Sequence, residues 1–107
     1  MEENMVLCAS SAYEQKYYFN EEFAGLPDAV KDELKILCVL FTEDVGGIFS
    51  ILFDEDGAII LRPEKDEEDI LYDDIGCGLK MRQLELDHAE LWEQLEAYYH
   101  AFIRCEI

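Results

Sequence analysis

The stretch from residue 28 to residue 61 constrains the fold of this chain most, because it is the most apolar part of the sequence. Pro27 precedes it, and proline is common in the first turn of a helix, where its missing N–H does no harm. Apolar residues then recur at helical spacing and also lie around the rest of the circumference, which is typical of a helix buried on several sides. We therefore expect a central helix over residues 27–44, ended by Gly46-Gly47.

A β-hairpin is expected after the glycine pair. Residues 48–53 and 58–62 are rich in β-branched and aromatic side chains, which favour strands. Asp56-Gly57 lies between them, and this dipeptide is a strong short-range hairpin signal. Pro63 is expected to end the second strand, because proline has no N–H for the ladder. Two strands alone form an unstable sheet, so we expect a small sheet that helices cover and that is open to extension at its edge.

Three more helices are expected to flank this hairpin. Residues 5–19 place apolar and aromatic side chains on one side at helical spacing. Residues 66–84 start with an N-cap at Asp66 and carry the apolar residues Ile70, Leu71, Ile75 and Leu79. Residues 87–103 start with a capping-box pattern, and their apolar face comprises Leu91, Trp92, Leu95, Tyr98, Tyr99 and Phe102. The sequence thus predicts an α+β fold, four helices flanking a β-hairpin, in one domain of residues 1–107.

One segment is open to two interpretations. Residues 79–86 could extend the third helix, or their apolar residues could alternate as a third strand. Gly76-Cys77-Gly78 weakens the helix and could kink or end it. We favour the helix.

The charge of the chain limits its partners. Its 107 residues include 26 acidic and 8 basic side chains, which gives a net charge of −18. Nucleic-acid phosphates need clustered Lys and Arg, whereas the basic residues here are scattered singly among acids. We therefore expect no nucleic acid and no membrane as a partner, but a protein, either a second copy or a basic partner surface. No segment approaches the roughly 18 apolar residues that span a bilayer, which predicts a cytoplasmic protein.

The four cysteines carry no recognisable motif. Cys8, Cys38, Cys77 and Cys105 contain no C-x-x-C pair, as zinc knuckles and dithiol redox sites require. In a reducing compartment they are expected as free thiols. Cys77 lies between two glycines and is expected to be the most exposed, but no histidine is assigned as its base. We therefore assign no catalytic residue.

No metal or cofactor site is expected either. The loop Asp54-Glu55-Asp56-Gly57 invites comparison with a calcium loop, but aligning Gly57 with the sixth position puts Leu52 first and Pro63 twelfth. Neither residue can supply the oxygen ligand that a calcium loop needs there. The glycine pairs match no phosphate-binding loop. The polar side of the last predicted helix is expected to face solvent, and it carries Glu93, Glu96 and His100.

Several segments of the chain resemble a known family. They are residues 1–8 (MEENMVLC), 12–19 (AYEQKYYF), 31–35 (KDELK) and 42–47 (TEDVGG). In these segments the chain resembles a family of short acidic bacterial proteins known only as a domain of unknown function, and the resemblance covers most of the chain. It implies a single cytosolic domain, and it carries no catalytic motif to transfer.

Three classes of function follow from these expectations. The first is a non-catalytic cytosolic interaction protein that self-associates as a homodimer, because aromatic residues are abundant and the predicted sheet is incomplete. The second is an acidic protein that mimics phosphate charge and blocks a partner's basic surface. The third is a small enzyme with a thiol or carboxylate site. The candidate interaction residues are Tyr13, Tyr17, Tyr18, Trp92 and Tyr99.

Overall fold

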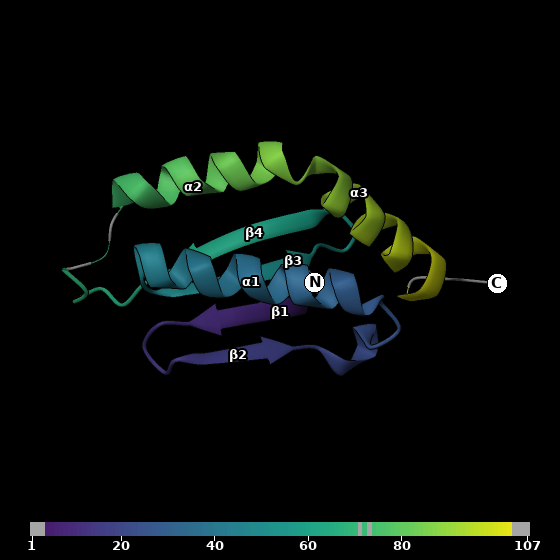
Figure 1. Ribbon diagram of the computed structural model, residues 1–107, viewed down its shortest axis with the longest axis horizontal. Helices are drawn as coiled ribbons and strands as arrows, with labels where there is room; N and C mark the ends of the chain where they lie inside the picture. The colour runs from purple at the N-terminus through teal and green to yellow at the C-terminus, as the bar shows by residue number, and fades with distance from the viewer. Residues whose placement is uncertain (1–3, 71, 73, 104–107) are drawn as a thin grey trace.

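A computed structural model describes residues 4–70, 72 and 74–103 of the chain. Its elements in chain order are β1 (Met5–Ser11), β2 (Lys16–Phe19), the 3-10 turn η1 (Glu21–Phe23), α1 (Asp28–Val45), β3 (Ile48–Phe53), β4 (Ile59–Glu64), α2 (Asp74–Asp87), α3 (Ala89–Tyr98) and the π turn η2 (Tyr99–Ile103) (Figure 1). The described residues thus form an α+β fold with three α-helices and a four-stranded antiparallel sheet. None of the described helices combines the length and the apolar character needed to cross a membrane.

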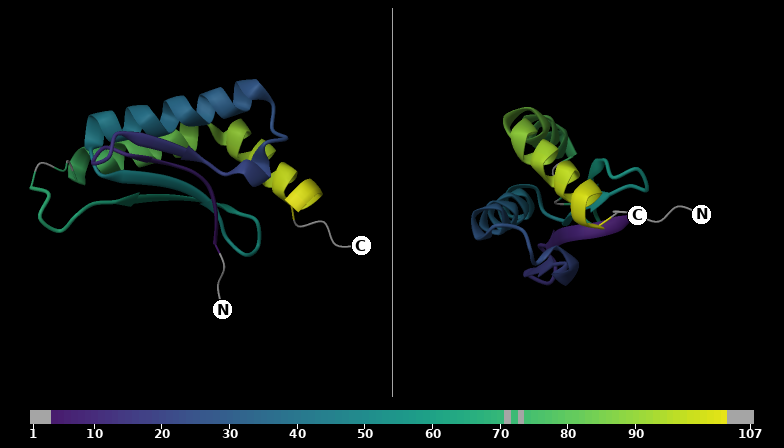
Figure 2. Two further views of the ribbon diagram at one scale, coloured as in Figure 1. Left: turned by 90° about the horizontal axis from the view of Figure 1, so that it is seen from below. Right: turned by 90° about the vertical axis from the view of Figure 1, so that its right-hand side faces the viewer.

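The sheet has the strand order β2-β1-β3-β4, so the two hairpins meet along the pair formed by β1 and β3. A bulge between Val6 and Cys8 leaves Leu7 as an extra residue, and the side chains of Leu7 and Cys8 are both fully buried. All three helices lie on one side of the sheet, with α1 running across β1 and β3 (Figure 2). The opposite face of the sheet therefore has no helix among the described residues.

The helix predicted over residues 5–19 is wrong, because this segment is the hairpin of β1 and β2. Its turn occupies residues 12–15, and Gln15 adopts the left-handed backbone conformation with φ 54°. Glycine or asparagine usually fills such a position, so the turn lacks its customary sequence signal. The dense aromatic residues of this segment instead reflect the strand preference of β2.

The helices predicted over 66–84 and 87–103 are displaced. The structure places residues 66–70 in turns outside any helix, and α2 begins only at Asp74. Asp87 is the last residue of α2 and caps no helix, so the predicted capping box is wrong. The glycines around Cys77 lie inside one continuous helix that also covers 79–86, which confirms the helical interpretation of that segment. Four helices flanking a single hairpin is therefore the wrong architecture.

The central part of the chain is predicted correctly. The helix expected over 27–44 is α1, and the hairpin expected after it is the pair of β3 and β4. Only the end of the second strand is wrong, because β4 continues through Pro63 to Glu64: an edge strand tolerates the missing N–H of proline. In the connecting turn, the Asp54 carboxylate accepts hydrogen bonds from the backbone N–H groups of Asp56 and Ala58, and Gly57 has φ 87°.

Stacked aromatic rings fill the core between the helices and the sheet. Phe53 on β3 stacks on Phe23 of η1 and on Tyr99 of η2, with ring centroids 5.3 and 4.7 Å apart. Phe41 of α1 stacks on Phe49 of β3 at 4.2 Å. These contacts join the N-terminal half, the central hairpin and the end of α3 into one cluster of buried residues.

Candidate functional site

The five aromatic residues expected to mediate interaction lie in different places and form no common patch. Tyr18 is 54% exposed and points away from α1, whereas Tyr17 on the same strand lies under Lys35 of α1. Tyr99 is only 8% exposed because it is part of the aromatic core. Trp92 on α3 is half-buried, and its Nε1–H donates a hydrogen bond to the Leu84 carbonyl at 3.1 Å.

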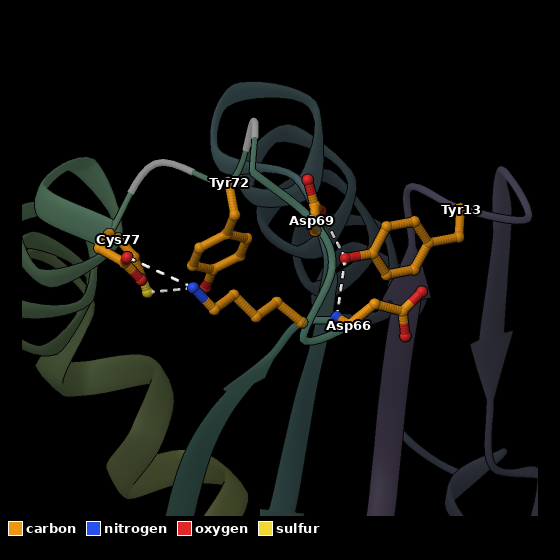
Figure 3. Close-up of polar contacts among 7 residues, drawn as sticks. Tyr13, Asp66, Asp69, Tyr72 and Cys77 are labelled. Carbon is orange, nitrogen blue, oxygen red and sulfur yellow. Dashed lines mark hydrogen bonds and ion pairs between the residues drawn. The ribbon is translucent and has the colours of Figure 1, made fainter.

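Tyr13, the remaining member of that set, forms hydrogen bonds with residues 66 and 69 in the loop before α2 (Figure 3). Its hydroxyl donates a hydrogen bond to the Asp69 carboxylate at 2.5 Å and accepts one from the Asp66 backbone N–H at 3.0 Å. The hydrogen bond to Asp69 raises the pKa of the Tyr13 hydroxyl, so the ring stays neutral and continues to donate. These contacts hold the acidic loop in turns, which explains why residues 66–70 are not helical.

A second tyrosine, Tyr72, forms a hydrogen bond with Cys77, the cysteine expected to be the most exposed. The Tyr72 hydroxyl donates a hydrogen bond to Sγ of Cys77 at 3.1 Å (Figure 3). Cys77 is 8% exposed and Cys8 and Cys38 are 0% exposed, so Cys77 is the most exposed of the described cysteines but is still buried. Burial, together with the bond to Cys77, raises the pKa of Tyr72 and keeps it protonated. Lys65 covers the Tyr72 ring at 5.3 Å and pairs with Asp74 at 3.4 Å, so the cluster anchors the start of α2.

Two other thiols meet in the core beneath α1. The Sγ atoms of Cys8 and Cys38 lie 3.7 Å apart, and both side chains are fully buried. The hydrogen bond between them and their burial raise the pKa of Cys38 far above its usual range. A neutral buried thiol is a poor nucleophile, so this pair packs as part of the core. Cys105 lies outside the described residues.

Glu93 and His100 are exposed, as expected, but other polar side chains at this end of the chain make contacts with the rest of the fold. His88 contacts Glu33 of α1 through Nδ1 at 3.3 Å, and the ring of His100 covers Gly57 of the hairpin turn. The Glu96 carboxylate accepts a hydrogen bond from the Ile59 backbone N–H at 2.9 Å, which ties α3 to β4. Glu96 therefore does not face solvent as expected. Within the described ranges, no group of three His, Cys, Asp or Glu side chains could hold a metal ion.

An open groove of about 690 Å³ runs between the first hairpin and α1. Its lining includes Ser10 and Thr42, whose hydroxyls lie 2.9 Å apart and are buried. The side chains of Lys16, Lys35 and Glu43 also border it. The groove could hold a small polar molecule, but its lining combines no cysteine or histidine with these hydroxyls.

The least expected feature lies on α2, which carries apolar side chains on two opposite sides. Cys77, Met81 and Leu84 pack against the core. At 100° per residue, Ile75, Leu79 and Leu86 lie about 180° away from them, and we name these three residues the outer stripe. The outer-stripe side chains are 79%, 67% and 69% exposed.

Two apolar residues of α1 are also exposed. Ile36 and Leu40 are more than half exposed. Leu40 also lines a groove of about 190 Å³ between α1 and α2. Globular proteins rarely leave contiguous apolar side chains in water unless the surface binds something. The sequence contains part of this signal, since Ile75 and Leu79 are apolar residues of the predicted helix, but it does not show that they are exposed.

Comparisons with known proteins identify a family but no activity. A family model, described as a family of unknown function (DUF6145), matches residues 4–106 of the chain. The match confirms the resemblance to a domain of unknown function. No curated protein matches the chain, and no solved structure matches it.

Proposed function

The chain belongs to DUF6145, a family of unknown function, and we propose that it is a non-catalytic cytosolic protein that binds a protein partner through the outer stripe of α2. The observation that carries this proposal is the exposure of Ile75, Leu79 and Leu86, each two-thirds or more exposed on one side of α2. Burying one such side chain stabilises a complex by about 1.5–3 kcal/mol. Within the described residues no element covers the stripe, so this free energy is available to a partner.

The contacts of the thiols support a non-catalytic role. Cys77 is occupied by the Tyr72 hydroxyl, and Cys8 and Cys38 are buried against one another.

The role as a mimic of phosphate charge stays a prediction. The salt dependence of partner binding distinguishes it from docking through the outer stripe. Binding driven by the net charge of −18 weakens strongly as salt is raised, because the Debye length falls to about 3 Å at 1 M. Binding through apolar side chains persists under the same conditions.

The proposal is tested by photo-crosslinking of the full-length chain in the cells that naturally contain it. A photoreactive residue is encoded at Leu86 in the outer stripe, and at Glu14, exposed in the β1–β2 turn, as the matched control. We expect a discrete protein adduct from position 86 and none from position 14. Introducing Ile75→Glu should abolish the adduct, because a charge in the stripe cannot be buried without cost.

The result has a clear contrary outcome. An absence of adducts from position 86, or adducts that Ile75→Glu leaves unchanged, would mean that the outer stripe is not a docking surface. The mass of the adduct also reports the partner, since a doubled chain mass identifies a second copy.

A further inference from the structure

We propose that α2 pairs in antiparallel orientation with α2 of a second copy of this chain, outer stripe against outer stripe. The inference rests on the proposed function, because it names the partner for the same surface.

The spacing of the stripe suits a two-fold symmetric contact. Ile75, Leu79, Arg82 and Leu86 follow one another at intervals of four, three and four residues, as along one seam of a helix pair. This series reads the same in both directions, so an antiparallel copy places Ile75 opposite Leu86 and Leu79 opposite Arg82. A two-fold symmetric interface needs such self-complementarity. Whenever one residue of the first copy contacts another residue of the second copy, the same contact recurs with the two copies exchanged.

Gly78 lies beside the seam, and the chain gives no internal reason for a glycine there. It is in the interior of α2, its φ is that of an ordinary helical residue, and a Cβ added to it would meet no atom within 4 Å. Glycine is the worst helix former after proline, so its position on an exposed helix needs another cause. The close approach of a second backbone would supply that cause.

The charges around the seam are complementary between two antiparallel copies. Arg82 lies within the stripe, and a two-fold pair must place an acidic side chain of the other copy beside it. Glu85 lies on the flank of the stripe, one turn from Arg82. Helical side chains point toward their own N-terminus, so in an antiparallel pair Arg82 of one copy and Glu85 of the other extend toward each other. Lys80 is already paired with Asp44 of the same chain at 2.8 Å.

The size of the surface predicts a weak dimer. From Ile75 to Leu86 the stripe spans about 16 Å along the helix axis. A contact between two such stripes falls at or below the low end of the roughly 1,200–2,000 Å² of stable interfaces. The dissociation constant is therefore expected on the order of 100 µM.

The orientation is tested by spin–spin distances between copies of the full-length chain, with an encoded spin-labelled residue at one position at a time. Labels at Asp74 and Asp87 should be offset by about 20 Å along the axis, and a label at Gln83 by about 8 Å. Equal distances at all three positions would mean a parallel pair and would overturn the proposal.

Dimer affinity, measured by sedimentation up to about 500 µM, gives the second readout. Gly78→Ala should weaken dimerisation about tenfold while raising the thermal midpoint of the monomer, a combination that misfolding cannot produce. Arg82→Glu and Glu85→Arg should each weaken it, and the double variant should restore it. Failure of the double variant to recover affinity would contradict the antiparallel arrangement.

The two proposals fail separately. A chain that stays monomeric at the highest concentration, yet still gives an adduct with another protein from Leu86, contradicts pairing with a second copy and leaves the docking surface standing. A monomeric chain with no adduct overturns both.

Discussion

The Sγ atom of Cys8 on β1 lies 3.7 Å from that of Cys38 on α1, at the place where the central helix crosses the sheet. Both side chains are fully buried. The hydroxyl of Tyr17 lies close to Cys8 and is buried, but no partner meets it with hydrogen-bond geometry. The hydrogen bond to Cys8 and burial keep Cys38 protonated well above the pH at which a free thiol ionises. Packing at this point therefore depends on the neutral forms of these groups.

The first prediction concerns alkaline pH. The folded-state pKa of Cys38 is raised above its unfolded value. The contribution of the neutral thiol to the free energy of unfolding is therefore fully present below about pH 8.5 and is lost as the pH rises. The free energy of unfolding should fall by about 1.4 kcal/mol per pH unit from this thiol alone. Urea unfolding between pH 7.5 and pH 10 measures the slope. Cys38→Ala should reduce it, and an unchanged slope in that variant would contradict the assignment.

The second prediction compares two tyrosine hydroxyls. Tyr17→Phe removes a buried hydroxyl that has no hydrogen-bond partner, so it should stabilise the fold by about 1 kcal/mol. Tyr72→Phe removes the donor to Cys77 and should destabilise by about 1 kcal/mol. Chemical unfolding at neutral pH measures both. Changes of the same sign in the two free energies of unfolding would contradict either the unpaired hydroxyl of Tyr17 or the hydrogen bond from Tyr72 to Cys77.

The third prediction concerns Ser10 and Thr42, whose hydroxyls lie 2.9 Å apart under α1. Thr42→Val leaves the Ser10 hydroxyl without this partner and should destabilise the protein by about 1–3 kcal/mol. Adding Ser10→Ala should recover part of that loss, because no unpaired hydroxyl then remains. A double-mutant cycle of unfolding free energies checks this, and strict additivity of the two changes would count against the contact.

The fourth prediction contrasts two glycines. A Cβ at Gly47 would overlap the Glu64 carbonyl oxygen and the Tyr72 ring, and the backbone there has φ 72°. Gly47→Ala should therefore destabilise the fold by about 2 kcal/mol or more. Gly78→Ala has open space and helical backbone, so it should stabilise the monomer by about 1 kcal/mol. Thermal unfolding of dilute samples measures both, and a stable Gly47→Ala variant would refute the close approach of Tyr72.

Local signals explain which parts of the fold were predictable. The helix α1 follows a proline and repeats apolar residues at one period, and Asp56-Gly57 marks the turn between β3 and β4. The first hairpin lacks both kinds of signal. Its turn places Gln15 in a left-handed conformation, and the bulge at Leu7 breaks the alternation of buried and exposed residues. The partner of β1 is β3, some 40 residues away in sequence, which no local pattern reveals.

The sequence predicts the start of α2 too early, and the exposed side of this helix was not predicted. The sequence predicts a helix from Asp66, and Ile70 and Ile75 are both among its apolar residues. The contacts of Tyr13 with Asp66 and Asp69 delay the helix to Asp74, and these contacts come from a distant turn. Leu71, expected in the same stripe, lies outside the described residues. The apolar residues of α2 on two opposite sides were visible in the sequence, but only the structure shows which side is covered.

The central claim, that two copies meet on the outer stripe of α2, is tested most directly by amide NMR spectra of the full-length chain over a dilution series. Between about 500 µM and about 20 µM, concentration-dependent shifts should be confined to α2 and to the α1 residues around Ile36 and Leu40. Leu79→Glu should remove this dependence and leave the rest of the spectrum unchanged. Spectra that do not change with concentration, or shifts located on the open face of the sheet, would contradict the claim.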